Sequence, residues 1–335
     1  MKDKIKVGIA GLGRIGKIHL KNLLQIDTLQ VVAVMDSDKN VLDDWDHNAP
    51  QRFTTSFDEL IQKDDLDAIL ICSPTDTHAQ HVIAAAQAGI HIFCEKPLDL
   101  SLGKVLEVLE IVKQNKVQLM LGFNRRFDKE FRKAHDMIKK GAIGNIRLIK
   151  IASRDPQAPP INYIKQSGGI FLDMTIHDFD MARYICGKEV VEVYAKGTAF
   201  NSEIKPTGDI DTAVTTLIFE DDSMAIIDNS RECSYGYDQR IEIFGSKGMI
   251  QVNNNFHNSN KLFTKEGVRG SLPLNFFIDR YKKAYQAEVQ KFINCIVHKK
   301  SIPVNGFDGL VSLKIGLAAQ KSLIENRPVR VDEIS

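Results

Sequence analysis

Three glycines, Gly11, Gly13 and Gly16, lie between an apolar run, Ile5–Ala10, and a segment of helical spacing that continues to Leu23. In a strand–turn–helix unit the first glycine permits a tight turn, the second lets the backbone approach a pyrophosphate, and the third allows close helix–sheet packing. The first turn of the helix offers N–H groups and the positive end of its dipole to the phosphates. The sequence therefore predicts a dinucleotide site at Gly11, Gly13, Arg14, Ile15 and Gly16.

Asp36 lies twenty residues after the last of these glycines, at the end of the next apolar run. A carboxylate at this place accepts hydrogen bonds from the ribose hydroxyls and repels a 2′-phosphate. The residues that follow, Ser37-Asp38-Lys39-Asn40, include no arginine that would reverse this preference. NAD is therefore the predicted cofactor, in preference to NADP. The alternative is a glycine-rich turn with an unrelated surface aspartate.

Short apolar runs alternate with segments of helical spacing over the first 120 residues, but not afterwards. Runs that are apolar without alternation are typical of strands buried on both faces of a parallel sheet. After about Gly144, successive strands separated by short Gly, Asp and Asn turns favour an antiparallel sheet. The predicted fold class is α/β, with a doubly wound parallel sheet followed by an α+β domain on an open, mostly antiparallel sheet. The expected strands are Ile5–Ala10, Val31–Met35, Ala68–Cys72, His91–Cys94, Val117–Leu121, Ile146–Ser153, Val190–Thr198, Thr212–Phe219, Met224–Asn229 and Arg240–Phe244.

Helical spacing in the second half predicts helices at Ile170–Ile185, closed by Gly187, at Arg280–Val297 and at Asp308–Glu325. A chain of 335 residues exceeds the roughly 250–300 residues at which one core stops growing, so two domains are expected. We place a dinucleotide-binding domain at 1–122 and a substrate-binding and oligomerisation domain at 123–335, with the last helix able to pack back on the first domain.

The composition excludes several classes of partner. With 44 Lys+Arg against 43 Asp+Glu, the net charge of +1 leaves no basic excess for a nucleic acid. No apolar stretch approaches the roughly 20 residues of a membrane span, and the first residues lack the plan of a signal peptide. Five cysteines without a CxxC pair indicate reduced thiols. A cytoplasmic protein that binds neither nucleic acid nor membrane is therefore expected.

The tripeptide Glu95-Lys96-Pro97 follows the strand His91–Cys94. Ligands of doubly wound sheets lie beyond the carboxyl ends of the strands, so Glu95 and Lys96 are expected at the cofactor. A cation there can favour the deprotonated form of a substrate hydroxyl. The alternative is a solvated lysine at a strand end.

A second strand end in the same half carries further polar side chains that could line the cofactor's far side: Ser73, Thr75 and His78. A helix N-cap at Thr75 with a surface His78 explains them equally well.

Asp173 and His177 are four residues apart in the expected helix 170–185, so both would project from one face. Oxidation of a secondary alcohol releases a proton from oxygen, and histidine, with an ordinary pKa of about 6.5, is suited to accept it. Asp173 would orient the imidazole or bind a substrate hydroxyl. Two alternatives are a structural intrahelical hydrogen bond and a pair of metal ligands. No other compact His/Cys cluster supplies a third ligand, so no metal is expected.

Together these motifs resemble the glucose–fructose oxidoreductase/inositol dehydrogenase (Gfo/Idh/MocA) superfamily, over nearly the whole chain. More specific strings are similar to its inositol 2-dehydrogenase branch: residues 122–128, 153–156, 176–180 and 235–238, and the helix containing Arg280, Tyr281, Ala284, Tyr285 and Glu288.

The resemblance implies an N-terminal Rossmann domain, a C-terminal α/β domain, a homotetramer, and oxidation of myo-inositol to the 2-keto inosose by NAD. It implies a catalytic set of Lys96, Asp173 and His177, and binding of inositol hydroxyls by Arg125, Asp155, Tyr235 and Tyr237. Two alternatives remain: the same chemistry on scyllo-inositol or a pyranose sugar, and a non-catalytic NAD-binding sensor.

Overall fold

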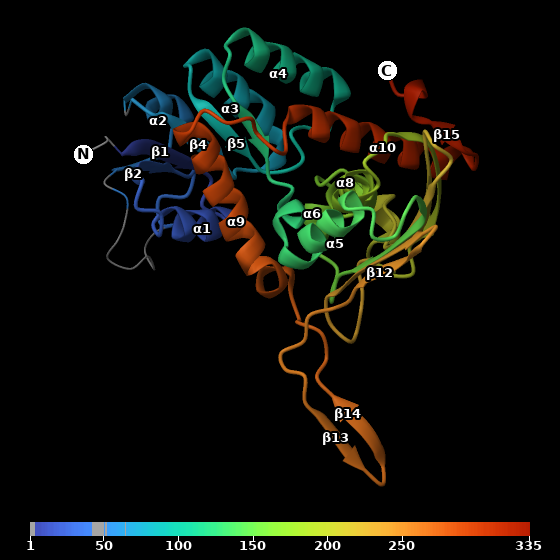
Figure 1. The fold of residues 1–335 in the computed structure, drawn as a ribbon. Coiled ribbons are helices and arrows are strands. Elements are labelled where there is room, and N and C mark those ends of the chain that lie inside the picture. The colour runs from blue at the N-terminus through green and yellow to red at the C-terminus, as the bar shows by residue number, and fades with distance from the viewer. Residues whose placement is uncertain (1–3, 42–49, 51, 64) are drawn as a thin grey trace. The chain divides into compact units, whose positions relative to one another are not determined.

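The computed structural model describes residues 4–41, 50, 52–63 and 65–335; the first three residues of the expected N-terminal segment lie outside this range. The chain divides into two compact units (Figure 1). Unit 1 contains residues up to 127 and residues 283–311, and unit 2 contains residues 128–282 and 312–335. Each unit is therefore made of two separate stretches of the sequence, whereas each predicted domain, 1–122 and 123–335, is one continuous range.

Unit 1 is built on a parallel sheet of six strands in the order β3-β2-β1-β4-β5-β6. The order reverses between β1 and β4, which is the arrangement at which doubly wound sheets bind ligands. Its central strands are apolar on both faces and buried, as their unalternating sequence predicts. The strands are β1 (Ile5–Ala10), β2 (Leu29–Met35), β3 (Arg52–Thr54), β4 (Ala68–Ile71), β5 (His91–Cys94) and β6 (Leu119–Leu121).

Helices follow the strands of this sheet in alternation, and a second segment of the chain joins them. This segment is residues 283–311, and Leu121 N of β6 donates a hydrogen bond to its Val304 O at 3.0 Å. The helices of unit 1 are α1 (Arg14–Leu23), α2 (Phe57–Lys63), α3 (Thr75–Gln87), α4 (Leu102–Gln114) and the 3₁₀ turn η1 (Asn124–Phe127). Helices α9 (Phe277–Val297) and α10 (Gly306–Glu325) each contribute residues to both units.

Unit 2 is built on a seven-stranded sheet in the order β12-β11-β7-β10-β9-β8-β15. Five of the six pairs of neighbouring strands are antiparallel, as expected, and β7 and β10 form the parallel pair. The α/β fold class predicted from the sequence, including a mostly antiparallel second sheet, is confirmed. The strands are β7 (Ile146–Arg154), β8 (Val190–Thr198), β9 (Thr212–Phe219), β10 (Met224–Ser230), β11 (Asp238–Gly245), β12 (Gly248–Val252) and β15 (Val329–Arg330).

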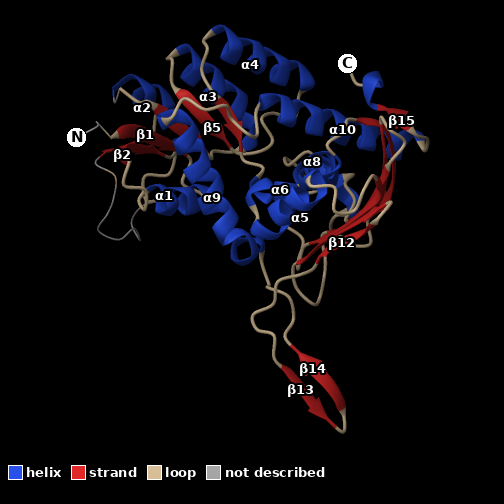
Figure 2. Ribbon diagram, viewed as in Figure 1, coloured by secondary structure: helices blue, strands red, loops and turns tan. Residues whose placement is uncertain are grey.

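The two faces of this sheet differ. Helices α5 (Lys129–Lys139) and α8 (Ile176–Cys186) lie against one face (Figure 2), while the register places a set of apolar side chains together on the other. These side chains are 38–49% exposed: Val214, Met224, Ile226, Phe244 and Met249. We call this set the apolar sheet face.

The helix predicted at Ile170–Ile185 is two helices, α7 (Gly169–Asp173) and α8, so the prediction of one continuous helix is wrong. The break falls at Met174–Thr175, where Thr175 is buried and its hydroxyl donates to Asn229 Oδ1, 2.8 Å away. Asn229 in turn donates to Asp178 Oδ2 at 2.8 Å. Buried hydrogen bonds to Asn229 of β10 therefore take the place of a continuous helix between α7 and α8. Gly187 closes α8 with a φ of +69°, as predicted.

Several short elements had no prediction. They include the strands β3, β12 and β15, the four-residue helix α6 (Ile161–Ile164), the hairpin strands β13 (Lys261–Thr264) and β14 (Gly267–Gly270), and the 3₁₀ turns η2 (Lys205–Thr207) and η3 (Val331–Glu333). The hairpin pairs only with itself. Among the described residues, no helix has the length and apolarity to cross a membrane.

Candidate active site

The glycine turn between β1 and α1 has the geometry that its sequence predicts. Gly11 adopts a φ of +87° and donates its N–H to Met35 O at 2.8 Å. A Cβ on Gly16 would lie against the carbonyl oxygen of Gly11, whereas a Cβ on Gly13 would meet nothing within 4 Å. The first and third glycines are thus required by the fold, and the second leaves the backbone open to a ligand.

The carboxylate of Asp36 is fixed at the edge of this turn. Its Oδ2 accepts a hydrogen bond from Leu12 N at 2.6 Å, and its Oδ1 accepts one from Asp38 N at 3.0 Å. Asp36 therefore stands beside the glycines at the end of β2, where an acceptor for ribose hydroxyls is needed. The residues of this turn fit the adenosine and pyrophosphate parts of a dinucleotide.

Strands β4 and β5 are neighbours, so the residues that follow them lie at one edge of the sheet. His78 links the two segments: its Nδ1 lies 2.8 Å from Pro97 O and its Nε2 lies 2.8 Å from Ser73 O. It is 2% exposed, and α3 is capped by Pro74, so the alternative of a Thr75 cap with a surface His78 is wrong. Ser73, Thr75, Glu95 and Lys96 all stand at this edge, and their contacts with a cofactor stay a prediction.

Asp173 is the last residue of α7 and His177 is the second residue of α8, so they do not share the face of one helix. Asp173 accepts two hydrogen bonds, from Tyr163 Oη at 2.8 Å and from Arg231 Nη1 at 3.2 Å. Arg231 is 1% exposed and also lies 3.4 Å from Asp209 Oδ2. The Asp173 carboxylate is therefore held in place by a buried cation and a phenol.

The residues expected to bind substrate hydroxyls occupy different environments. Arg125 is buried in η1 of unit 1, and Asp155 follows β7 in unit 2 with its N–H bonded to Ser230 O. Tyr235 donates to Asp238 Oδ2 at 2.6 Å and accepts from Arg154. Burial and the bond to Asp238 raise the pKa of Tyr235 to about 12, so its hydroxyl keeps its proton. Tyr237 is buried against Tyr281.

Sequence reasoning missed four residues that contact or lie near predicted site residues. Arg231 and Tyr163 bind Asp173 from 58 and 10 positions away, distances at which no local pattern exists. His19 and Glu288 lie with Glu95 in a buried cluster of unit 1. Only Glu288 had a signal in the sequence: it is a polar residue on the otherwise apolar face of the segment that forms α9.

Two family models match the chain. Residues 5–123 match the oxidoreductase family with an NAD-binding Rossmann fold, and residues 131–251 match the GFO/IDH/MocA C-terminal domain. The chain belongs to the GFO/IDH/MocA oxidoreductase family. The family resemblance, the NAD cofactor and the assignment as an NAD-dependent oxidoreductase, all predicted from the sequence, are confirmed.

Individual family members are similar over their full length. A Thermotoga maritima protein named myo-inositol 2-dehydrogenase is 46% identical, over 98% of this chain and 99% of its own. A crystal structure of a probable dehydrogenase from the same organism matches with a TM-score of 0.96 and 46% identity, covering 99% of this chain and 100% of the other. Scyllo-inositol dehydrogenase from Lactobacillus casei, solved with NAD(H) and scyllo-inositol, matches with a TM-score of 0.91 and 34% identity, covering 98% and 100%.

Proposed function

We propose that this oxidoreductase acts on CH–OH groups and oxidises a ring alcohol of inositol, converting myo-inositol to the 2-keto inosose. The observation that carries the proposal is the full-length similarity to a protein named myo-inositol 2-dehydrogenase. The site residues support it, because Lys96, Asp173 and His177 supply the acid–base groups that alcohol oxidation needs.

The proposed chemistry divides between the cofactor and the chain. NAD, when bound at the glycine turn, would supply the acceptor for the hydride that leaves the ring carbon. His177 accepts the hydroxyl proton as the C–H bond breaks and the C=O bond forms. Lys96 stabilises the developing negative charge on that oxygen. Asp173, already fixed by Arg231 and Tyr163, supports the imidazolium or binds a neighbouring hydroxyl.

Substrate selection is proposed to come from hydrogen bonds. Arg125, Asp155, Tyr235 and Tyr237 present donors and acceptors suited to a cyclitol that carries a hydroxyl on every ring carbon. A site that bonds each hydroxyl rejects an analogue lacking one, because a buried protein group is then left unpaired.

A panel of substrates with NAD, followed by absorbance of the reduced cofactor, tests this function. We expect kcat/KM for myo-inositol to exceed that for glucose, and that for a deoxyinositol, by about a hundredfold or more. A higher value for scyllo-inositol would reassign the isomer. Activity on glucose with none on any inositol would remove the inositol assignment. Tight NAD binding without turnover across the panel would identify a non-catalytic sensor.

We also propose a homotetramer in the cytoplasm. The apolar sheet face supports an assembly, because exposed apolar side chains grouped on one face of a sheet are typical of protein interfaces. All five cysteines are free thiols, which fits a reducing compartment.

Replacing Ile226 and Phe244 of the apolar sheet face by lysine is expected to lower the molar mass in light scattering, since buried charges oppose association. The paired change Ile324→Lys and Leu106→Lys, at exposed apolar positions of helices α10 and α4, is the control. A parent protein with the mass of a monomer would contradict the proposal.

A further inference from the structure

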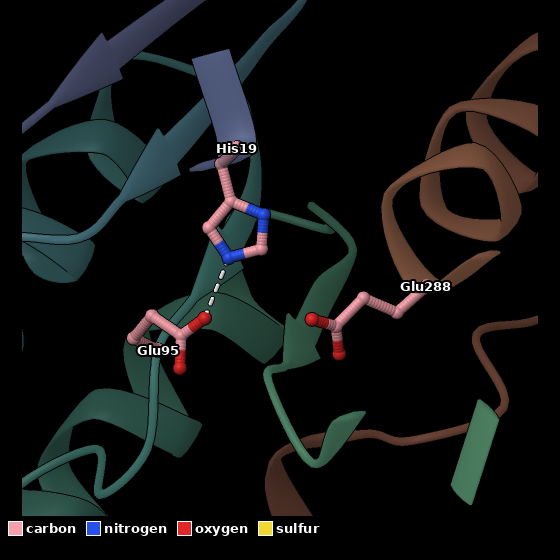
Figure 3. A group of neighbouring side chains, drawn as sticks. All are labelled: His19, Glu95 and Glu288. Atoms are coloured by element: carbon pink, nitrogen blue, oxygen red, sulfur yellow. Dashed lines mark hydrogen bonds and ion pairs between the residues drawn. The ribbon is translucent and has the colours of Figure 1, made fainter. Parts of the chain in front are cut away.

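Three titratable side chains of unit 1 form a cluster in which only Glu95 has an expected role so far. His19 comes from α1, Glu95 follows β5 and Glu288 comes from α9, and their polar ends point toward one another (Figure 3). His19 Nε2 lies 2.6 Å from Glu95 Oε1. The Glu288 side chain is fully buried, and neither of its oxygens has a hydrogen-bond partner among the described residues.

The geometry of this cluster suits a proton better than a metal ion. The candidate ligand atoms lie within 4.8 Å of one another, so a divalent cation has to be considered. Two ligands of one tetrahedral zinc, with bonds of about 2.0–2.1 Å, lie about 3.3 Å apart. The 2.6 Å between His19 Nε2 and Glu95 Oε1 is instead a direct hydrogen-bond contact, too short for two ligands of one ion.

The Glu95 carboxylate has little freedom to move. His19 holds one of its oxygens, and the backbone at Gly122 closes the other side, since a Cβ there would lie 2.8 Å from Glu95 Oε2. The next residue along the chain is Lys96. The placement of Glu95 therefore determines where the Lys96 backbone begins.

We propose that Glu288 is kept as a neutral carboxylic acid against Glu95, and that it thereby positions Lys96 for hydride transfer. This inference rests on the proposed function for the role of Lys96. A neutral acid exerts no charge repulsion on Glu95 and can donate its proton toward it, directly or through one water molecule. Ionised Glu288 would place a second negative charge in the cluster and displace Glu95 together with Lys96.

The surroundings of Glu288 favour the neutral acid. Burial, and then the charge of Glu95, raise the pKa of Glu288 well above its ordinary value. His19 from α1 also faces Glu288. The His19 ring makes an edge-on contact with the ring of Tyr285 in α9. Cys72, after β4, is near both glutamates, and Cys94, at the end of β5, is near Glu95; burial raises the pKa of both thiols, so they stay uncharged at neutral pH.

The test uses Glu288→Gln in the full-length protein, because glutamine is neutral at every pH and has nearly the same shape. We expect the affinity of the parent for NADH, and its kcat on the best substrate, to fall on the alkaline side. The Gln variant should keep both within about threefold of their values at pH 7. Glu288→Ala should lower kcat about tenfold or more at pH 7 without raising the KM for the polyol comparably. Asp279→Asn, an exposed carboxylate of the same helix, is the control and should follow the parent.

Protein stability supplies an independent reading. A raised pKa in the folded state means that the parent loses unfolding free energy as the pH rises from the ordinary glutamate value, about 4.3, toward the raised value. The unfolding midpoints of parent and Gln variant should therefore be close near pH 4.5 and separate toward alkaline pH, with the variant higher.

Two results would overturn the inference. One is a Gln variant whose NADH affinity falls with pH as the parent's does. The other is a bound metal, shown by one equivalent of zinc or manganese in the parent, absent from the Gln variant, with activity lost to a chelator. The NADH-binding and stability readings need no substrate, so they fail separately from the proposed inositol oxidation.

Discussion

Replacing His177 by alanine is expected to lower kcat on the best polyol by about 10²–10⁴-fold, the usual contribution of one positioned acid–base group. Without the imidazole, the hydroxyl proton has to pass to solvent while the hydride leaves. The dissociation constant for NAD should stay within about twofold of the parent value, because His177 lies in unit 2 and the dinucleotide turn lies in unit 1. Steady-state turnover and NADH fluorescence titration measure the two quantities.

The exposed histidine His257 offers a matched control, since His257→Ala removes the same atoms from the same unit. This control should turn over at the parent rate. An equal rate for His177→Ala would show that the proton leaves by another group, and the proposed mechanism would be wrong.

The second large effect is expected at the glycine turn. Gly16→Ala places a methyl group against the backbone carbonyl of Gly11, where no flexible side chain can give way. We expect the free energy of unfolding without cofactor to fall by about 1–3 kcal/mol, the usual cost of overpacking, and NAD binding to weaken more than tenfold. Alanine is otherwise favoured over glycine inside a helix, so a loss of stability here reports the steric contact.

Gly13→Ala is the paired variant, because its methyl group would enter open space. The stability of the free protein should change by less than about 0.5 kcal/mol, while NAD binding still weakens because the pyrophosphate approaches this backbone. Chemical denaturation and NADH titration separate the two glycines. If Gly16→Ala were as stable as Gly13→Ala and bound NAD normally, the assigned role of the third glycine would fail.

Elements governed by local pattern could be predicted. Strand β1 begins and ends where its apolar run does, and β8 and β9 also have the predicted bounds. The short strand β3 could not be predicted, since three residues carry no periodicity. The break between α7 and α8 escaped prediction for a different reason. Thr175 is compatible with a helix, and only the distant Asn229 makes the other conformation favourable.

The candidate site divides in the same way. Gly11, Gly16 and Asp36 were predictable because a short stretch of backbone brings them together. The groups that hold Asp173 were not, because Arg231, which follows β10, is 58 positions away in the sequence. Predicting Glu288 would have required knowing that α9 packs beside Glu95, which is a property of the tertiary structure.

The discontinuity of unit 1 limits how the nucleotide-binding half can be produced alone. Arg126 is nearly buried and pairs with Asp308 Oδ1 at 3.0 Å, and Leu121 N of β6 donates a backbone hydrogen bond to Val304 O. An expression fragment ending at residue 127 would lack both Asp308 and Val304. It would expose the guanidinium of Arg126 and the edge of β6. A permuted gene that joins residues 283–311 to the N-terminal segment through a short artificial linker would restore them.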